Sequence, residues 1–199
     1  MTETAQINVL VPDAIRLLLT RRSGSAKRMT GPGPTPEELD IILTAAMRVP
    51  DHGKLAPWRF IVFAGDARAS FGNELARILA VNEPDASAER RELERTRFLR
   101  APVVVGVVSR LTPGIPIPEW EQTLSAGAAC FSLSLAARAL GFVASWVTEW
   151  CAYDGAVCRV LGLSEQERVA GFIYLGQPTD TLEDRPRPAI QAHVSHFGG

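Results

Sequence analysis

Residues 48–64 read RVPDHGKLAPWRFIVFA and join a polar loop to an apolar run. Val49 precedes Pro50, a position that disfavours helical backbone, so we expect a helix to end near Arg48. The β-branched and aromatic residues from Trp58 to Ala64 predict a strand. The stretch therefore predicts a helix end, a polar loop and a buried strand in succession, and the rest of the chain can be placed around this junction.

Toward the N-terminus, residues 12–20 (PDAIRLLLT) have helical spacing of apolar residues, with a proline near the first turn. Arg21-Arg22-Ser23 follows directly at the exit of this helix, and residues 24–34 are rich in Gly, Ser and Pro and predict a loop. Thr35-Pro36-Glu37-Glu38 has the pattern of a capping box, which begins the helix that ends near Arg48.

Toward the C-terminus, apolar periodicity and breaker residues predict alternating helices and strands. Helices are expected at 68–80, 88–100, 118–140 and 155–161, and strands at 103–108, 142–147 and 169–175. The charged helix at 88–100 is expected to be solvated, and the strand at 103–108 to be buried on both faces. The mixture predicts an α+β fold in a single domain, 1–199, with a Pro-rich tail from about 177 to 199.

Small residues gather in the long helix expected at 118–140. Residues 125–129 read SAGAA, which permits the close approach of another helix. A central core helix explains the same residues and is the preferred interpretation.

The composition excludes several classes of function. The 199 residues carry 21 basic and 22 acidic side chains, so no positive field is available to hold nucleic acid or an anionic membrane. Residues 1–8 do not have the pattern of a secretory signal, and the apolar stretch 124–147 is interrupted by Arg138, unlike a membrane span. We therefore expect a cytoplasmic protein.

Cysteine and histidine give no metal-site pattern. Cys130, Cys151 and Cys158 form no Cys-x-x-Cys pair and are expected to be core thiols. The three histidines do not approach an HExxH motif, and His193 with His196 is only a weak pair. No metal is expected.

Sequence motifs for phosphate-binding loops and for nucleophilic catalysis are also missing. Gly31-Pro32-Gly33-Pro34 neither follows a strand nor opens a helix, as a dinucleotide fingerprint must. The sequence has no P-loop and no Gly-x-Ser-x-Gly elbow. If the protein is an enzyme, its reactive atom is therefore expected to belong to a cofactor.

Two polar clusters are the candidates for holding such a group. Arg21-Arg22-Ser23 offers guanidinium forks that match phosphate, although the same tripeptide is common on surfaces. Arg48 and His52 lie in the second cluster, where they could also be a helix-dipole partner and an ordinary loop histidine.

Taken together and in order, these motifs resemble the FMN-dependent nitroreductase family. The resemblance rests on Arg21-Arg22-Ser23 after a helix, on Pro50-Asp51-His52, and on Pro57-Trp58 opening a strand, with Gly141-Phe142 before Trp146 and Tyr174-Leu175-Gly176 at the last strand. It covers nearly the whole chain and is strongest for the small, minimal branch whose loop carries Pro-Asp-His.

The resemblance implies an intertwined homodimer of α+β subunits, each with a mixed or antiparallel sheet flanked by helices, and two FMN sites built from both chains. It implies that Arg21 and Ser23 bind the FMN phosphate or ribityl chain with Arg22 beside them, and that Arg48 and His52 line FMN from the same subunit. The other subunit would place Trp146, Val147 and Thr148 against the flavin. A weaker part of the resemblance puts NAD(P)H near Ala136, Ala137, Arg138, Ala139, Leu140 and Gly141.

The implied activity is a ping-pong transfer of hydride from NAD(P)H through flavin N5 to a small nitroaromatic, quinone or enone-like acceptor. Lys54, Ala56 and Thr148-Glu149 depart from the family pattern, which has Asn, Gln and Glu-Gly at these positions in many members. Arg185 or Arg187 could be a further phosphate ligand or a surface residue. A non-catalytic FMN-binding or storage protein, and a flavoenzyme of the same fold with another reaction such as reductive dehalogenation, stay open as alternatives.

Overall fold

A computed structural model describes residues 10–198 and has five strands in one sheet. These are β1 (Met29–Thr30), β2 (Trp58–Ala64), β3 (Val103–Arg110), β4 (Val143–Val147) and β5 (Glu167–Pro178). The sheet order is β1-β5-β3-β2, and β4 also pairs with β5. All four pairings are antiparallel, so the antiparallel form of the expected sheet is the one observed.

β5 pairs with three other strands. Val103 of β3 lies opposite Leu175, Val147 of β4 opposite Phe172, and Met29 of β1 opposite Pro178. The expected strand at 169–175 is therefore too short, because pairing with β1 carries it to Pro178. The β3 expectation is confirmed: each of its residues except Arg110 is buried.

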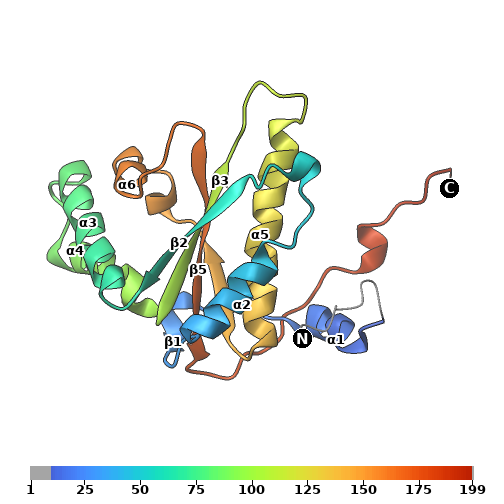
Figure 1. The fold of residues 1–199 in the computed structure, drawn as a ribbon. Helices are drawn as coiled ribbons and strands as arrows, with labels where there is room; N and C mark the ends of the chain where they lie inside the picture. The colour runs from blue at the N-terminus through green and yellow to red at the C-terminus, as the bar shows by residue number, and fades with distance from the viewer. Residues whose placement is uncertain (1–9, 199) are drawn as a thin grey trace.

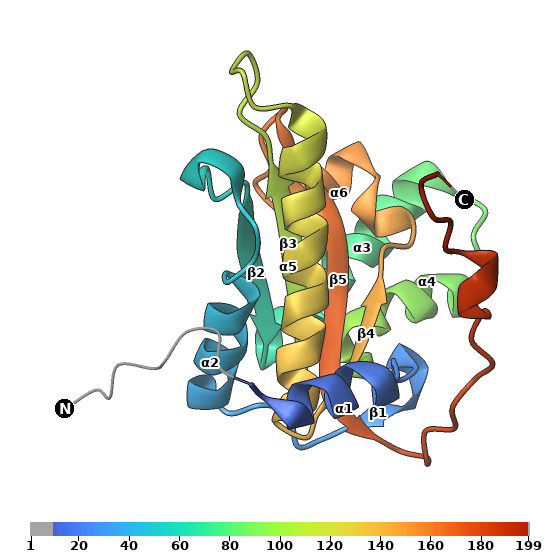
Figure 2. The ribbon, with the colours of Figure 1, turned by 90° about the vertical axis from the view of Figure 1, so that its right-hand side faces the viewer.

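Helices cover both faces of the sheet (Figures 1 and 2). One face carries α2 (Pro36–Ala46) and α5 (Glu119–Ala139), and the other carries α3 (Asp66–Asn82), α4 (Ala88–Arg95) and α6 (Gly155–Val160). Each face has its own apolar core: Ile42, Val105 and Leu133 belong to the first, and Phe98 and Phe172 to the second. The α+β prediction is confirmed.

Local signals account for the helix ends. Thr35 and Glu38 form the expected capping box, in which each side chain accepts from the other residue's backbone N–H, and α2 begins at Pro36. The helix ends at Ala46, two residues earlier than expected. The loop expected at 24–34 also contains a 3₁₀ turn at Ala26–Arg28 and the short strand β1.

Two expectations about burial are wrong in part. The charged segment 88–100 forms α4, which is mostly exposed as expected, and a 3₁₀ turn at Arg97–Arg100, but Glu94 and Arg97 are buried. They pair with each other and with Trp150 and Glu149, which satisfies both charges in the interior. Cys130 and Cys151 are core thiols, whose pKa burial raises to about 12, whereas Cys158 is only half-buried.

The two ends of the described chain lie outside the cores. α1 (Pro12–Thr20) has no buried residue, and Leu19 is 76% exposed. Beyond β5 the described part of the tail, to residue 198, has one 3₁₀ turn at Ile190–Ala192 and projects from the body (Figure 1). No helix within residues 10–198 is long and apolar enough to cross a membrane. Residues 1–8, considered above as a signal segment, lie outside the described range.

Candidate functional site

The candidate site is an open depression of about 620 Å³ between α5, β4, the end of α1 and the tail. This volume is in the range of pockets that bind cofactor-sized molecules. Its lining comprises Arg21, Ser23, Phe131, Ser134, Trp146, Val147, Thr148, Ala170 and Arg185.

One side of the depression is cationic. The chain leaves α1 in an extended conformation at Arg21, whose Nη2 donates to Ser23 Oγ at 2.9 Å. Within the described residues neither Arg21 nor Arg185 forms an ion pair with a carboxylate, so both guanidinium groups keep donors for a ligand. Two such groups and a hydroxyl suit a phosphate.

The other side is formed by Trp146, whose position depends on a glycine. The indole of Trp146 lies across Gly171 of β5 and donates from Nε1 to Ala170 O at 3.1 Å. A Cβ at position 171 would lie 2.0 Å from that Nε1. The absence of a side chain at Gly171 therefore lets the indole lie there, with 44% of Trp146 exposed.

Arg22 lines a different depression from Arg21. Its Nε donates to Glu183 O at 2.7 Å, and it lines a neighbouring depression of about 580 Å³ together with Arg28 and Asp180. Ser23 belongs to both linings. Of the three consecutive residues expected at FMN, the structure thus brings Arg21 and Ser23 to Trp146 and turns Arg22 away.

Arg48 and His52 are also absent from the lining. They lie in the loop after α2. Ser125 of α5 holds this loop in place, because its Oγ donates to Pro50 O at 2.7 Å. His52 Nδ1 is 2.7 Å from Glu121 Oε2, on the first turn of α5. Figure 2 shows α2 and β2 on one flank of α5 and β4 on the other.

This arrangement differs from the expected grouping of the site residues by subunit. Trp146, Val147 and Thr148 were expected to come from the chain opposite Arg21 and Ser23, but all five line one depression in the same chain. Arg48 and His52, like Arg22, lie outside this lining, and α5 stands between them and β4.

The segment expected to meet NAD(P)H, 136–141, ends α5 and turns into β4. Arg138 and Ala139 line a third depression, of about 540 Å³, with residues of α1, and Ala137 is buried. None of the six residues lines the depression that contains Trp146.

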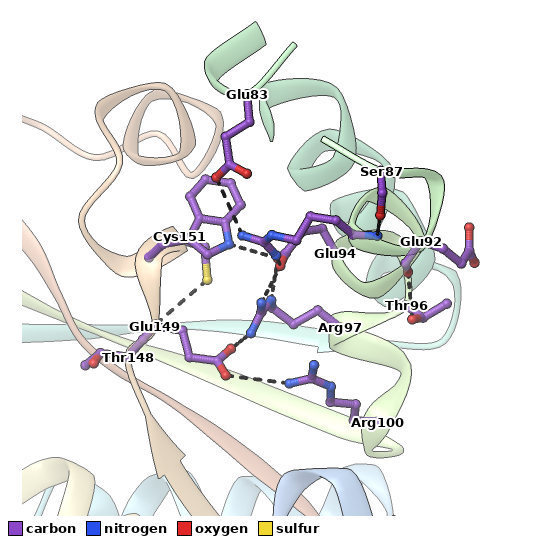
Figure 3. A network of polar contacts seen from close by, with 12 residues as sticks. Glu83, Ser87, Glu92, Glu94, Thr96, Arg97, Arg100, Thr148, Glu149 and Cys151 are labelled. Carbon is purple, nitrogen blue, oxygen red and sulfur yellow. Dashed lines mark hydrogen bonds and ion pairs between the residues drawn. The ribbon is translucent and has the colours of Figure 1, made fainter. Parts of the chain in front are cut away.

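Behind Thr148 lies a buried ionic cluster that the sequence reasoning missed (Figure 3). Glu149 pairs with Arg97 and, at 3.7 Å, with Arg100, while Glu94 accepts from Arg97 and from Trp150 Nε1 at 2.9 Å. Burial of Glu94 favours its neutral form, but these hydrogen bonds and the charge of Arg97 outweigh it and hold the pKa of Glu94 below its usual range. The spacing of Glu94 and Arg97 is the only trace of the cluster in the sequence.

Glu149 has a backbone conformation that side chains rarely adopt. Its φ is 57° and its ψ is −179°, a region almost confined to glycine that costs of order 1–3 kcal/mol elsewhere. Lys54 and Ala56, in the loop with His52, also have positive φ, and there Asp51 Oδ1 and Oδ2 accept from Leu55 N and Ala56 N. Lys54, Ala56 and Glu149, three of the residues that depart from the family pattern, therefore all have a positive φ.

No group of three or more Cys, His, Asp or Glu residues gathers as a metal cage in the described part of the chain.

Comparison with known structures gives the fold class first. The structure matches a nitroreductase-like protein from Bacillus cereus with a TM-score of 0.83 at 20% identity, over 96% of this chain and 99% of that one. It matches a nitroreductase with bound FMN from Bacteroides fragilis with a TM-score of 0.68 at 20% identity, over 90% and 96% of the two chains. The fold is nitroreductase-like, as predicted.

The chain belongs to the nitroreductase family, whose model matches residues 19–177. A relative from Haemophilus influenzae named "Putative NAD(P)H nitroreductase" is 40% identical over 174 residues, which cover 86% of this chain and 91% of the relative. A relative with the same description from Escherichia coli is 37% identical and covers 83% and 88%. The family expected from the sequence is confirmed.

Proposed function

We propose that this chain binds FMN in the depression between α5 and β4 and acts as an NAD(P)H-dependent oxidoreductase. The observation that carries the proposal is the pairing, in one depression, of Arg21 and Ser23 with the exposed indole of Trp146. The names of the relatives from H. influenzae and E. coli and the FMN bound to the B. fragilis protein support it.

The residues of the depression fit FMN at both ends. Arg21 and Arg185 would meet the phosphate with charge-assisted hydrogen bonds, and Ser23 would add a hydroxyl. Phe131 and Trp146, both more than one-third exposed, offer apolar surface to a planar ring.

When bound, FMN supplies a ring that accepts and returns a hydride at N5. The chain's own part would be to orient the ring between the lining residues, to exclude water with Phe131 and Trp146, and to place Val147 and Thr148 beside it. NAD(P)H and a small acceptor would visit the same open side in turn, which agrees with the missing dinucleotide fingerprint. NAD(P)H contacts at 136–141 would be limited to the outer part of the dinucleotide, since these residues lie outside the depression.

The same proposal includes a homodimer of single-domain subunits in which each FMN site is shared. Arg48 and His52 could reach FMN only from a second chain, because α5 separates them from the depression of their own chain. Apolar side chains are exposed over α1, α2 and α5 and would be covered in such a dimer: Ile15, Leu19, Ile41, Leu124 and Phe131.

Purification of the full chain tests the proposal. Acid extraction should release FMN, and NADH or NADPH should bleach the flavin without oxygen. Finding FAD, or no flavin even after FMN is added, contradicts FMN binding. Bound FMN that neither nucleotide reduces indicates a storage protein, and reoxidation of the reduced protein by nitro, quinone, enone or halogenated compounds identifies the acceptor.

A further inference from the structure

The segment that lines the depression is attached to a buried cluster at two consecutive residues. Val147 and Thr148 face the depression, and Glu149 and Trp150 follow them directly. Glu149 pairs with Arg97 and Arg100, and Trp150 Nε1 donates to Glu94 at 2.9 Å. Glu94 lies on α4, and Arg97 and Arg100 lie in the 3₁₀ turn that follows it, so the attachment joins distant parts of the chain (Figure 3).

The attachment point is also the strained point. Glu149 has a φ of 57° with an extended ψ, a combination almost confined to glycine. A residue with a side chain keeps such a conformation only when surrounding contacts hold it there. The side chain of Glu149 pairs with Arg97 and Arg100, and its backbone O also accepts from Ala152 N at 3.2 Å.

Arg97 is well placed to hold Glu149 in this conformation. The side chain of Arg97 is only 6% exposed and is fixed on its other side by Glu94, which is fully buried. The cation is therefore immobile, and loss of the Glu149 carboxylate would leave Arg97 still paired. Arg100, whose side chain is 12% exposed, would lose the ion pair with Glu149. This loss is the same whether alanine or glycine replaces Glu149, so it does not affect a comparison of those two variants.

We infer that Glu149 is a positioning residue: its ion pair with Arg97 holds the strained turn that presents Val147 and Thr148 to the depression. This inference rests on the proposed binding of FMN there. Glu149 itself does not line the depression, so its effect on a ligand would pass through the backbone of the turn.

Three substitutions separate the backbone role from a general loss of stability. Glu149→Ala removes the ion pair and keeps the strain, so FMN affinity should fall by about tenfold, as expected when a conformation of this kind loses its supporting contacts. Glu149→Gly removes the ion pair and the strain together, so its loss should be clearly smaller. Glu92→Ala is the matched control, because Glu92 pairs with Arg95 on α4 away from this turn.

Affinity is measured by titrating the apoprotein with FMN, and hydrogen exchange of the flavin-free chain is followed over residues 143–153. Faster exchange confined to this segment in Glu149→Ala, with affinity ordered wild type, Glu149→Gly, Glu149→Ala, supports the inference. Wild-type affinity in Glu149→Ala, or equal losses in the Ala and Gly variants, overturns it. If Glu149→Ala does not fold, Glu149→Gln takes its place, and Glu149→Gly should again bind FMN more tightly.

The experiment distinguishes a failure of the proposed FMN binding from a failure of the inference about Glu149. If the wild type binds no FMN, that proposal is wrong, and the exchange measurement on the flavin-free chain still decides whether Glu149 holds the turn. Unchanged exchange at residues 143–153 in Glu149→Ala would then overturn the inference as well.

Discussion

Arg21 faces the depression with no carboxylate partner in the described chain, and this makes its expected effect specific to a charged ligand. Arg21→Ala should weaken FMN binding by about 2 kcal/mol, or roughly thirtyfold, the range of a charge-assisted bond to phosphate. Riboflavin, which lacks the phosphate, should bind the variant and the wild type almost equally. Titration of both flavins measures the difference.

Arg16 supplies the control for Arg21, because it lies on α1, the helix directly before Arg21 in the chain, and pairs with Asp13 at 3.2 Å on the surface. Arg16→Ala should leave both affinities unchanged. Equal losses of FMN and riboflavin in Arg21→Ala would show that Arg21 is a structural residue rather than a phosphate ligand.

The charge of Glu94 should make the protein less stable as the pH falls into the acid range. Its pKa is lowered in the folded state, although burial opposes this, because Arg97, Trp150 and Arg90 stabilise the charged form. The carboxylate therefore stabilises the fold fully above its unfolded pKa of about 4.3, and this stabilisation is lost as the pH falls through the lower folded value. Glu94→Gln should lower the free energy of unfolding by about 2 kcal/mol near pH 7.

The difference between wild type and Glu94→Gln should shrink as the pH falls below about 4, and denaturant unfolding over a pH series measures it. Glu92→Gln, which alters an exposed pair, should show a small difference throughout. A Glu94→Gln effect that does not change with pH would contradict the assigned role of the charge.

At the scale of elements, β4 and β5 form the inner wall of the site because a glycine makes room for an indole. Gly171→Ala should displace Trp146, since the added Cβ would lie 2.0 Å from Nε1, and should break the bond from Nε1 to Ala170 O. FMN affinity should fall by about tenfold, and the near-ultraviolet circular dichroism should change, with a stability loss near 1 kcal/mol from the broken bond.

Gly106 is the matched control for Gly171, because it lies in the neighbouring strand β3 and an added Cβ would approach Phe172 no closer than 3.4 Å. In a Trp146→Ala background, Gly171→Ala should have little further effect on affinity. An unchanged FMN affinity in Gly171→Ala alone would remove Trp146 from the proposed site.

Local patterns predicted the elements well where their causes are local. The capping residues Thr35 and Glu38 fix the start of α2, and the apolar run of β3 indicates burial on both faces. Glu94 and Arg97 were assigned to solvent because their burial depends on Glu149 and Trp150, which are more than 50 residues away in the chain. A charge pattern alone carries no information about such distant partners.

For the whole molecule, the position of α5 gives a test of which residues share a subunit. Arg21→Ala and Arg48→Ala chains, unfolded and refolded together, should form heterodimers with one intact site, because these residues would come from different chains. Arg21→Ala mixed with Trp146→Ala should recover nothing, because one chain supplies both residues. FMN binding and NAD(P)H oxidation measure recovery.

Each variant refolded alone, and wild type refolded in the same way, are the controls for the mixing experiment. Recovery from the Arg21 and Trp146 mixture would show that the site is divided as first expected from the sequence. A wild type that runs as a monomer while FMN stays bound would contradict sharing altogether.

The sequence could order the motifs along the chain but could not place them on the flanks of α5, because that placement depends on tertiary packing.

The central position of β5 also constrains how the protein is made. This strand spans residues 167–178 and pairs with β1, β3 and β4, which precede it in the chain. A nascent chain therefore cannot complete this sheet until residue 178 has been translated. Until then β3, apolar along nearly its whole length, lacks one of its two neighbours, and its unpaired edge is open to pairing with other chains.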